Sequence, residues 1–261
     1  MLVLAGIWAG LAGLLIVAGK VVTHSAALTH FDQHVTRVVV GWRTPALNSA
    51  MKAVTWLGSW VAVLVTAVII AVLVSTRRLP VLAAIVAVFA WAGEAGGVAI
   101  AKAVVGRRRP PQAIWLVHAR GWSFPSGHSA AACLAFAILA LCVATLARRG
   151  ASIAGWLIAG LAVAATAFSR VELGVHWTTD VIASVVFVTV WLTAIGIVLG
   201  GRLRPGRLAE RTVVPEPPPG SDGISRTQKW DPVDLVRCRH VRPTQNLASL
   251  PVPLERPVKV R

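Results

Sequence analysis

Six long apolar segments constrain the fold of this chain more than any other feature of its sequence. About 20 apolar residues suffice to cross a hydrocarbon core about 30 Å thick. Inside hydrocarbon the backbone must satisfy its own hydrogen bonds, so each segment is expected to be an α-helix. The predicted spans are residues 2–22, 54–74, 81–101, 126–147, 151–168 and 177–199. The predicted fold class is therefore all-α, a polytopic membrane protein with about six transmembrane helices.

The composition is too apolar for an ordinary soluble domain. Of the 261 residues, 56% are hydrophobic and only 14% are charged, whereas soluble domains average about 25% charged residues. The first apolar segment lacks the basic start and small-residue cleavage site of a signal peptide, so we expect a retained helix. Cys133 and Cys142 lie within an apolar segment. They are expected to be small buried hydrophobes, with no disulfide or metal knuckle.

The net charge of +16 is shared between a membrane domain, residues 1–200, and a tail, residues 201–261. From residue 202 onward there are 12 basic and 6 acidic residues, which assigns +6 to the tail and, by difference, +10 to the membrane part. Cations next to lipid favour membrane lipid headgroups or an anionic substrate as partners. No nucleic acid partner is expected, because no soluble domain carries the charge. The tail contains VVPEPPPGSDG and is predicted to be a disordered, basic, Pro-rich cytoplasmic extension.

The connections between the spans alternate between long and short. Because consecutive spans alternate in direction, the long connections are expected at one end of the bundle and the short ones at the other. Short basic connections near residues 78 and 149 belong to one side, and the connections 23–53, 102–125 and 169–176 to the other. The long connections are also basic, so counting charges alone does not orient the chain. If their cations serve a site, the short Arg-rich connections mark the cytoplasm. Both termini are then cytoplasmic, and the site lies near the extracytoplasmic face. Residues 31–52 mix apolar and charged residues and are expected to lie in the membrane interface.

Three polar clusters lie on the side of the long connections. In KAVVGRRRP, two cations seven residues apart share one helix face if the third span continues through them. PSGH opens the fourth span, and in SRVELGVHWTTD a carboxylate follows a histidine by one helical turn. The candidate residues are Lys102 and Arg109 in the first cluster, Ser126, Gly127 and His128 in the second, and Arg170, His176 and Asp180 in the third.

Together these clusters have the chemistry of a phosphate site with acid–base groups. Arginines bind phosphoryl oxygens through paired donors, lysine adds a point charge, and a helix start offers unpaired N–H groups. A metal site formed by His128, His176 and Asp180 is disfavoured, because the surrounding cations would repel a metal and only one carboxylate is available. We therefore expect neither a metal nor any other cofactor.

Other charged residues receive simpler interpretations. Arg107 and Arg108 are interpreted as anchors whose heads reach the lipid headgroups. Glu94, inside the third span, is expected to face the bundle interior and to make an internal hydrogen bond. Glu172 is expected to tune access to the site or to neutralise nearby arginines.

The motifs K-x6-RP, PSGH and SR-x5-H-x3-D, in this order, resemble the three-part signature of the type 2 phosphatidic acid phosphatase family. The resemblance covers roughly residues 30–200, and every signature position matches. One departure lies outside the signature, where Thr178 stands in place of a proline often found there. The resemblance implies a bacterial membrane phosphatase that hydrolyses the terminal phosphate of a lipid phosphate or prenyl diphosphate.

The resemblance also implies a role for each candidate residue. His176 is similar to the nucleophile that forms a phosphohistidine, and Asp180 to the carboxylate that orients it. His128 corresponds to the general acid that protonates the leaving group and then activates water. The phosphate-binding residues would be Lys102, Arg109, Ser126, Gly127 and Arg170, and the family's reaction requires no metal.

Two alternatives and several details stay open at this point. A non-catalytic protein that binds or transports lipid phosphates would use the cations alone, and would not need two histidines and a carboxylate beside them. A vanadate-dependent haloperoxidase would share the pocket, but six membrane spans argue against it. The substrate is not identified: phosphatidic acid, phosphatidylglycerophosphate, a C50 or C55 prenyl diphosphate and a prenyl-phospho-sugar phosphate all fit. The oligomeric state is also unknown.

Overall fold

The structure, a computed structural model, describes residues 2–199, and every regular element in this range is helical. The α-helices are α1 (Leu2–His24), α2 (Ala26–Gly41), α3 (Pro45–Val54), α4 (Trp60–Ser75), α5 (Val81–Val105), α6 (Gly127–Leu146), α7 (Arg149–Glu172) and α8 (Thr178–Leu199), and the 3-10 turns are η1 (Thr55–Gly58) and η2 (Gln112–Ile114). Five α-helices are long and apolar enough to cross a membrane, and a bent pair can supply a sixth span. The predicted fold class is confirmed, while the predicted tail lies outside the described residues.

Two predicted spans differ from the helices that form. The second is broken, because residues 45–58 meet α4 at an angle of 45°. Ser59 causes the break: its extended backbone ends η1, and its Oγ accepts a hydrogen bond from Val61 N at 3.2 Å, which caps α4. The fifth span, predicted over residues 151–168, is longer and extends through Glu172. It therefore carries Arg170 as part of a helix.

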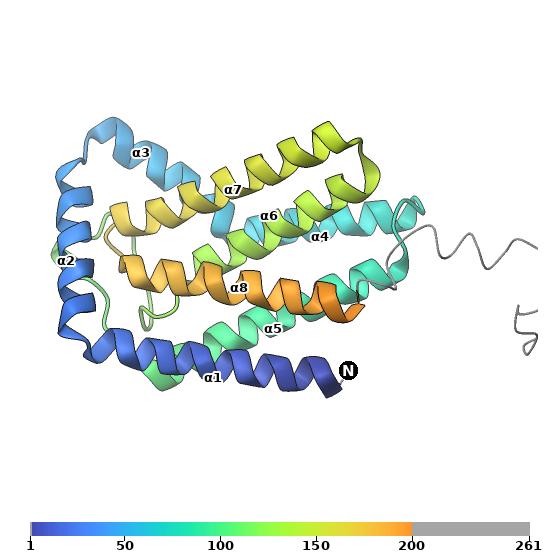
Figure 1. Cartoon of the computed structure of the whole chain (residues 1–261). Coiled ribbons are helices and arrows are strands. Elements are labelled where there is room, and N and C mark those ends of the chain that lie inside the picture. The colour runs from blue at the N-terminus through green and yellow to red at the C-terminus, as the bar shows by residue number, and fades with distance from the viewer. Residues whose placement is uncertain (1, 200–261) are drawn as a thin grey trace, which may run out of the picture. The chain divides into compact units, whose positions relative to one another are not determined.

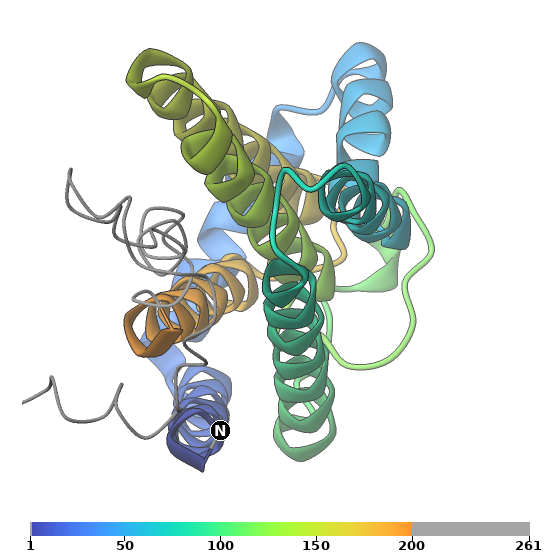
Figure 2. The same cartoon turned by 90° about the vertical axis from the view of Figure 1, so that its right-hand side faces the viewer.

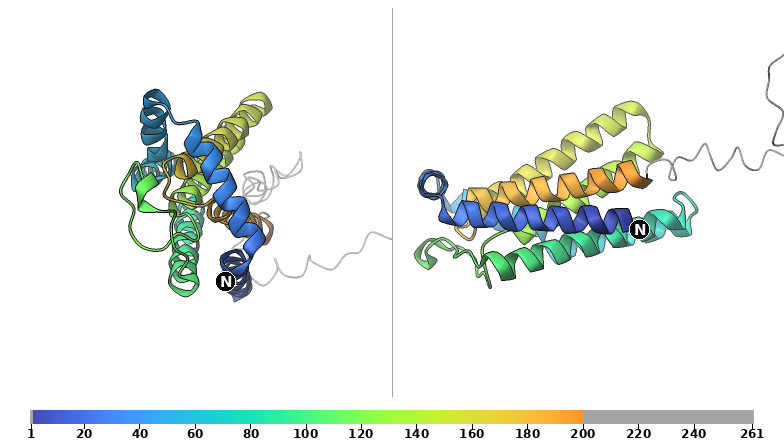
Figure 3. Two further views of the ribbon diagram at one scale, coloured as in Figure 1. Left: turned by 90° about the vertical axis from the view of Figure 1, so that its left-hand side faces the viewer. Right: turned by 60° about the horizontal axis from the view of Figure 1, so that its bottom comes forward.

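The helices that run alongside one another form a bundle, and α2 lies across one of its ends (Figures 1 and 3). Most of α2 and α3 comes from the segment predicted to lie in the interface. Two caps turn the chain there: Ser25 Oγ accepts from Leu28 N at 3.4 Å, and Thr44 Oγ1 accepts from Leu47 N at 3.1 Å. The short connections α4–α5 and α6–α7 lie at the opposite end, which faces the viewer in Figure 2. The long connections therefore share the end that α2 crosses.

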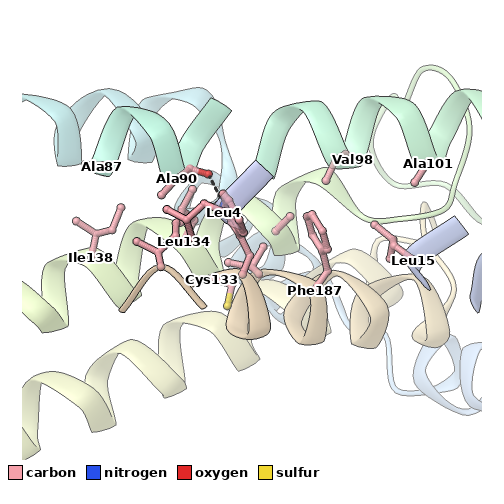
Figure 4. Packing of buried hydrophobic residues seen from close by; sticks show 14 of the residues in the cluster. Leu4, Leu15, Ala87, Ala90, Val98, Ala101, Cys133, Leu134, Ile138 and Phe187 are labelled. Carbon is pink, nitrogen blue, oxygen red and sulfur yellow. Dashed lines mark hydrogen bonds between the residues drawn. The ribbon is translucent and has the colours of Figure 1, made fainter. Parts of the chain in front are cut away.

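The apolar core lies where α1, α5, α6 and α8 pack together. Trp191 is fully buried and donates from Nε1 to the carbonyl oxygen of Ala90 at 3.1 Å. Gly93 and Gly97 let α5 approach α8 closely, because a Cβ at either position would overlap Trp191 or Phe187. Figure 4 shows Phe187 of α8 directed toward α5. In a membrane no hydrophobic driving force acts between helices, so close packing of this kind holds them together. Here it fixes the position of α5 along the axis of α8.

The turn η1 packs against the start of α6 and against α7, and its contact with α6 leaves no room for a side chain at Gly58. A Cβ there would overlap the carbonyl oxygen of His128 and lie 2.8 Å from Thr166 Cγ2. We expect Gly58→Ala to lower the free energy of unfolding by about 1–3 kcal/mol, the usual cost of overpacking. Thermal unfolding in detergent measures this. The control is Gly160→Ala on α7, where a Cβ meets nothing within 4 Å, and an unchanged midpoint for Gly58→Ala would contradict the expectation.

Candidate active site

His176 lies in the turn between α7 and α8, and Asp180 lies in the first turn of α8. His176 Nδ1 is 3.4 Å from Asp180 Oδ2, and both side chains are buried. The same Oδ2 accepts a hydrogen bond from the backbone N–H of Trp177 at 3.0 Å, as a carboxylate at a helix start commonly does. At 3.4 Å the contact with the ring is longer than a strong hydrogen bond. Asp180 therefore acts on His176 mainly through orientation and charge.

The other ring nitrogen of His176 faces a guanidinium group. Nη1 of Arg109 lies 3.0 Å from His176 Nε2. Arginine carries only donors, so Nε2 accepts this hydrogen bond and the proton of the neutral ring sits on Nδ1. Burial lowers the pKa of His176 from 6.5 to about 3; Arg109 and Arg170 add to this shift, and Asp180 opposes it. The ring is therefore neutral near pH 7, with its lone pair on the side of the cations.

Lys102 and Arg109 converge, although not in the way that their spacing predicts. The helix α5 ends at Val105, and Gly106 follows with φ of +63° in the left-handed region that suits glycine. The prediction of a shared helix face is therefore wrong. Both cations instead reach the loop before α6: Lys102 Nζ donates to the carbonyl oxygen of Trp122 at 2.7 Å, and Arg109 Nη2 donates to the same oxygen at 3.3 Å.

Arg109 is held by several carbonyl groups in addition. Its Nη1 donates to Val175 O at 2.6 Å, its Nε to Gly121 O at 3.0 Å, and its Nη2 to Arg120 O at 2.9 Å. These bonds tie the loop before α6 to the turn before α8. Arg109 thus sets the position of the cluster as well as its charge.

PSGH forms the start of α6. Ser126 is the N-cap, its Oγ accepts from Ser129 N at 3.4 Å, and its backbone N–H donates to Asp180 O at 3.2 Å. Its hydroxyl group is buried and also contacts the Ser129 hydroxyl at 3.0 Å, so it serves the helix start directly. Gly127 and His128 open the first turn, where N–H groups are free of intrahelical partners.

Arg170 occupies the last turn of α7 and completes the cluster. Its Nη1 donates to Thr55 Oγ1 at 2.6 Å, while its buried Nε has no partner among the described residues. Its carbonyl oxygen accepts from the N–H groups of Val175 and His176, both at 3.2 Å, and so shapes the turn that carries the histidine. The positive charges of Arg170, Arg109 and Lys102 act on the ring of His128.

The structure therefore brings the candidate residues of all three motifs to one end of the bundle. Lys102, Arg109 and Arg170 lie at this end with His128 and His176, beside the N-terminus of α6, and Asp180 pairs with His176. Mutual repulsion among cations is relieved when an anion binds between them, so the arrangement suits a phosphoryl group. Among residues 2–199, no three His, Cys, Asp or Glu side chains are placed to hold a metal ion together.

Arg107 does not lie where the sequence predicts. It was expected to reach the headgroups as an anchor, but it is only 5% exposed. Its Nη1 donates to Asp180 Oδ1 at 2.6 Å, and its Nη2 donates to Asp32 Oδ2 at 2.7 Å. Its neighbour Arg108 is exposed. Asp32 is itself buried, and a buried carboxylate requires such a partner.

Ser123 is a further residue that the motifs did not indicate. It is buried, and its hydroxyl group donates to Asp180 Oδ2. Nothing in the local sequence distinguishes it from other serines. Its role becomes visible only when the loop before α6 is placed against α8.

Within residues 2–199, the side chains of the two remaining acidic residues make no hydrogen bond or ion pair with the candidate site residues. Glu172 is buried, and its Oε1 is 3.8 Å from Nε of Arg43 on the connection between α2 and α3. It neutralises an arginine, as expected, but one outside the motifs. Glu94 is buried in α5 and faces the interior as predicted. The internal hydrogen bond expected for it is not found among the described residues.

The helical membrane fold and the clustered cations and histidines suit a membrane phosphatase, and comparison with known proteins identifies the family. Residues 60–204 match the PAP2 superfamily model, and the chain belongs to this family of membrane lipid phosphatases. The family resemblance drawn from the three motifs is thereby confirmed.

Two matches from Bacillus subtilis, one by sequence and one by structure, are informative. Phosphatidylglycerophosphatase B of strain 168 is 30% identical over 163 residues, which cover 61% of this chain and 78% of the relative. A crystal structure of a transmembrane PAP2-type phosphatidylglycerolphosphate phosphatase superimposes with a TM-score of 0.65 at 25% identity. That match covers 74% of this chain and 96% of the other. The similarity to this solved transmembrane phosphatase, together with the five to six candidate spans, supports a multi-pass membrane protein.

Proposed function

We propose that this protein is a metal-independent phosphatase that removes the terminal phosphate of a lipid phosphate or prenyl diphosphate through a phosphohistidine at His176. One observation carries the proposal. The Nε2 atom of His176 is an acceptor that faces the cations, while its protonated Nδ1 faces Asp180. The names of the B. subtilis relatives make phosphatidylglycerophosphate the first substrate to test.

The terminal phosphoryl group would lie between the three cations and the start of α6. Lys102, Arg109 and Arg170 bind its oxygens, with the first N–H groups of α6, at Gly127 and His128, as further donors. Arg109 then moves its hydrogen bond from Nε2 to a phosphoryl oxygen, which frees the lone pair for attack. The cations stabilise the charge that the phosphoryl oxygens carry during transfer.

The first step transfers the phosphoryl group to the enzyme. The Nε2 lone pair of His176 forms a bond to phosphorus, and the bond from phosphorus to the leaving oxygen breaks. The bound phosphate brings negative charge next to His128 and favours its protonated form. His128 gives its proton to the leaving alkoxide or phosphate. Asp180 stabilises the positive ring of His176 through Nδ1, as the carboxylate does in catalytic triads.

The second step returns the enzyme to its starting state. His128, now neutral, takes a proton from water, and the water oxygen attacks phosphorus. The bond from phosphorus to Nε2 breaks, and inorganic phosphate leaves. His176 is again neutral and His128 is again protonated, so atoms and protons balance over the cycle.

The proposal places the site at the extracytoplasmic face and both termini in the cytoplasm. Charges at the other end of the bundle support this orientation. Arg77, Arg78 and Arg148 lie in the connections there and Arg149 begins α7, and short Arg-rich connections are typical of the cytoplasmic side.

Phosphate release by the purified protein in detergent tests the proposal. We expect phosphatidylglycerophosphate to be hydrolysed at an unchanged rate after excess EDTA is added, because side chains and backbone N–H groups bind the phosphoryl group in the proposed mechanism without a metal ion. Phosphatidic acid, a prenyl diphosphate and glycerol 3-phosphate form the comparison panel, and glycerol 3-phosphate should be the poorest because it lacks an apolar chain. Loss of activity with EDTA contradicts the metal-free mechanism. Binding of lipid phosphate without release would establish the non-catalytic alternative.

A further inference from the structure

We propose that Arg107 and Asp32 are positioning residues, which set the orientation and charge of Asp180 through a buried Asp32–Arg107–Asp180 chain of ion pairs. The chain joins α2, which crosses the end of the bundle, to the carboxylate that faces His176. The proposal rests on the phosphatase function proposed above. It adds two residues that lie outside the eight candidates of the motifs.

Arg107 bridges the two carboxylates with the two arms of its guanidinium group. One arm bonds Asp180 Oδ1 at 2.6 Å and the other bonds Asp32 Oδ2 at 2.7 Å. The three side chains are at most 6% exposed, so water competes little for these bonds. Trp177 covers the guanidinium group, whose Cζ lies 5.7 Å from the ring centroid.

Thr179 secures the Asp32 end of the chain. Its backbone N–H donates to Asp32 Oδ1 at 2.9 Å, and its hydroxyl group donates to Asp32 Oδ2 at 2.5 Å. Thr179 immediately precedes Asp180 on α8, so Asp32 holds both the guanidinium group and the backbone beside the carboxylate. Asp32 thereby fixes the first turn of α8 relative to α2.

The chain determines which oxygen of Asp180 serves His176. Arg107 holds Oδ1, while Oδ2 accepts from Ser123 and from Trp177 N and faces the histidine ring, so the carboxylate cannot rotate without breaking the 2.6 Å bond to Arg107. A buried carboxylate without a cation tends to take up a proton, and protonated Asp180 would no longer stabilise a positive ring. Arg107 keeps Asp180 ionised.

Asp32 balances the charge of this arrangement. With Arg107 alone, the guanidinium group would cancel the charge of Asp180 and weaken its effect on His176. With Asp32 included, two carboxylates and one guanidinium group carry a net charge of −1 beside the ring. This charge is what a nucleophilic histidine requires as it becomes positive on attack.

Steady-state kinetics on purified variants test the proposal, with Arg107→Gln, Arg107→Lys and Asp32→Asn as the variants. We expect Arg107→Gln to lower kcat roughly 10- to 100-fold, the loss typical when the partner that orients a functional side chain is removed. KM and the inhibition constant of inorganic phosphate should stay within about threefold of wild type, because Lys102, Arg109 and Arg170 are intact.

Conservative changes and a neighbouring control separate positioning from general stability. Arg107→Lys should recover much of kcat because it restores a cation, and Asp32→Asn should lose less than Arg107→Gln because an amide still accepts from Arg107. Arg108→Gln removes an adjacent exposed arginine and should leave kcat unchanged. If Arg107→Gln fails to fold, the double variant Asp32→Asn/Arg107→Gln removes one of the two unpaired carboxylates and should show the same selective loss of kcat.

Three results would overturn the proposal. The first is wild-type kcat per folded molecule in Arg107→Gln or in the double variant. The second is an equal loss in Arg107→Lys and Arg107→Gln, and the third is a rise in KM without a fall in kcat. A wild-type protein that releases no phosphate would instead refute the proposed function itself, so the two failures are distinguishable.

Discussion

Replacement of His176 by alanine is expected to slow phosphate release by at least about 10⁴-fold, the scale of loss when a catalytic nucleophile is removed. In the proposed mechanism His176 supplies the attacking atom, because its Nε2 lies beside Arg109 while Nδ1 faces Asp180. The cations remain, so the variant should still bind inorganic phosphate with nearly wild-type affinity. The loss should therefore appear in kcat.

Rapid quenching with ³²P-labelled substrate measures this directly. The wild-type protein should carry an alkali-stable, acid-labile label during turnover, and His176→Ala should carry none. His118→Ala, which changes an exposed histidine in the loop before α6, is the matched control and should behave as wild type. Label that persists in His176→Ala, or a rate within tenfold of wild type, would assign the nucleophile elsewhere.

Replacement of His128 by alanine is expected to slow hydrolysis of the lipid substrate by about 10²- to 10⁴-fold, the usual contribution of a general acid or base. The effect should depend on the leaving group. A nitrophenolate departs without a proton, so p-nitrophenyl phosphate should still phosphorylate His176 in this variant. Water activation is then missing, and the phosphohistidine should accumulate.

A burst experiment resolves the two steps. His128→Ala should release about one equivalent of nitrophenol per enzyme molecule and then turn over slowly. His30→Ala, an exposed histidine on α2, should show steady release at the wild-type rate. If His128→Ala releases nitrophenol neither in a burst nor in turnover, then His128 acts in the first step even without a proton to give. The proposed roles, His176 as nucleophile and His128 as general acid and then base, would then be wrong.

The apolar segments and the spacing of the three motifs were sufficient to predict the helical membrane fold and the family. Helix ends were harder to predict, because single residues determine them. The left-handed conformation of Gly106 ends α5 before Arg109, which ordinary helix periodicity would have continued. Ser59 divides an apolar run that looks continuous from residue 54 to residue 74.

The role of Arg107 could not be predicted for a different reason. Its partner Asp32 lies 75 positions away, on a segment whose amphipathic pattern indicated only an interfacial location. A run of three arginines near a membrane surface is typical of anchors that contact lipid headgroups. Only the packing of α2 against α8 shows that one of the three is buried between carboxylates, so the contact belongs to tertiary structure and not to local sequence.

The order of the motifs along the chain has a consequence for biosynthesis. Lys102, Arg109, His128 and Arg170 are all translated before His176, the proposed nucleophile in the turn after α7, and before Asp180, which lies on α8. A nascent chain that stops at residue 172 contains the proposed phosphate-binding side chains, but it lacks His176, Asp180 and the Val175 carbonyl group that holds Arg109. Under the proposed mechanism, hydrolysis therefore has to await the insertion of α8.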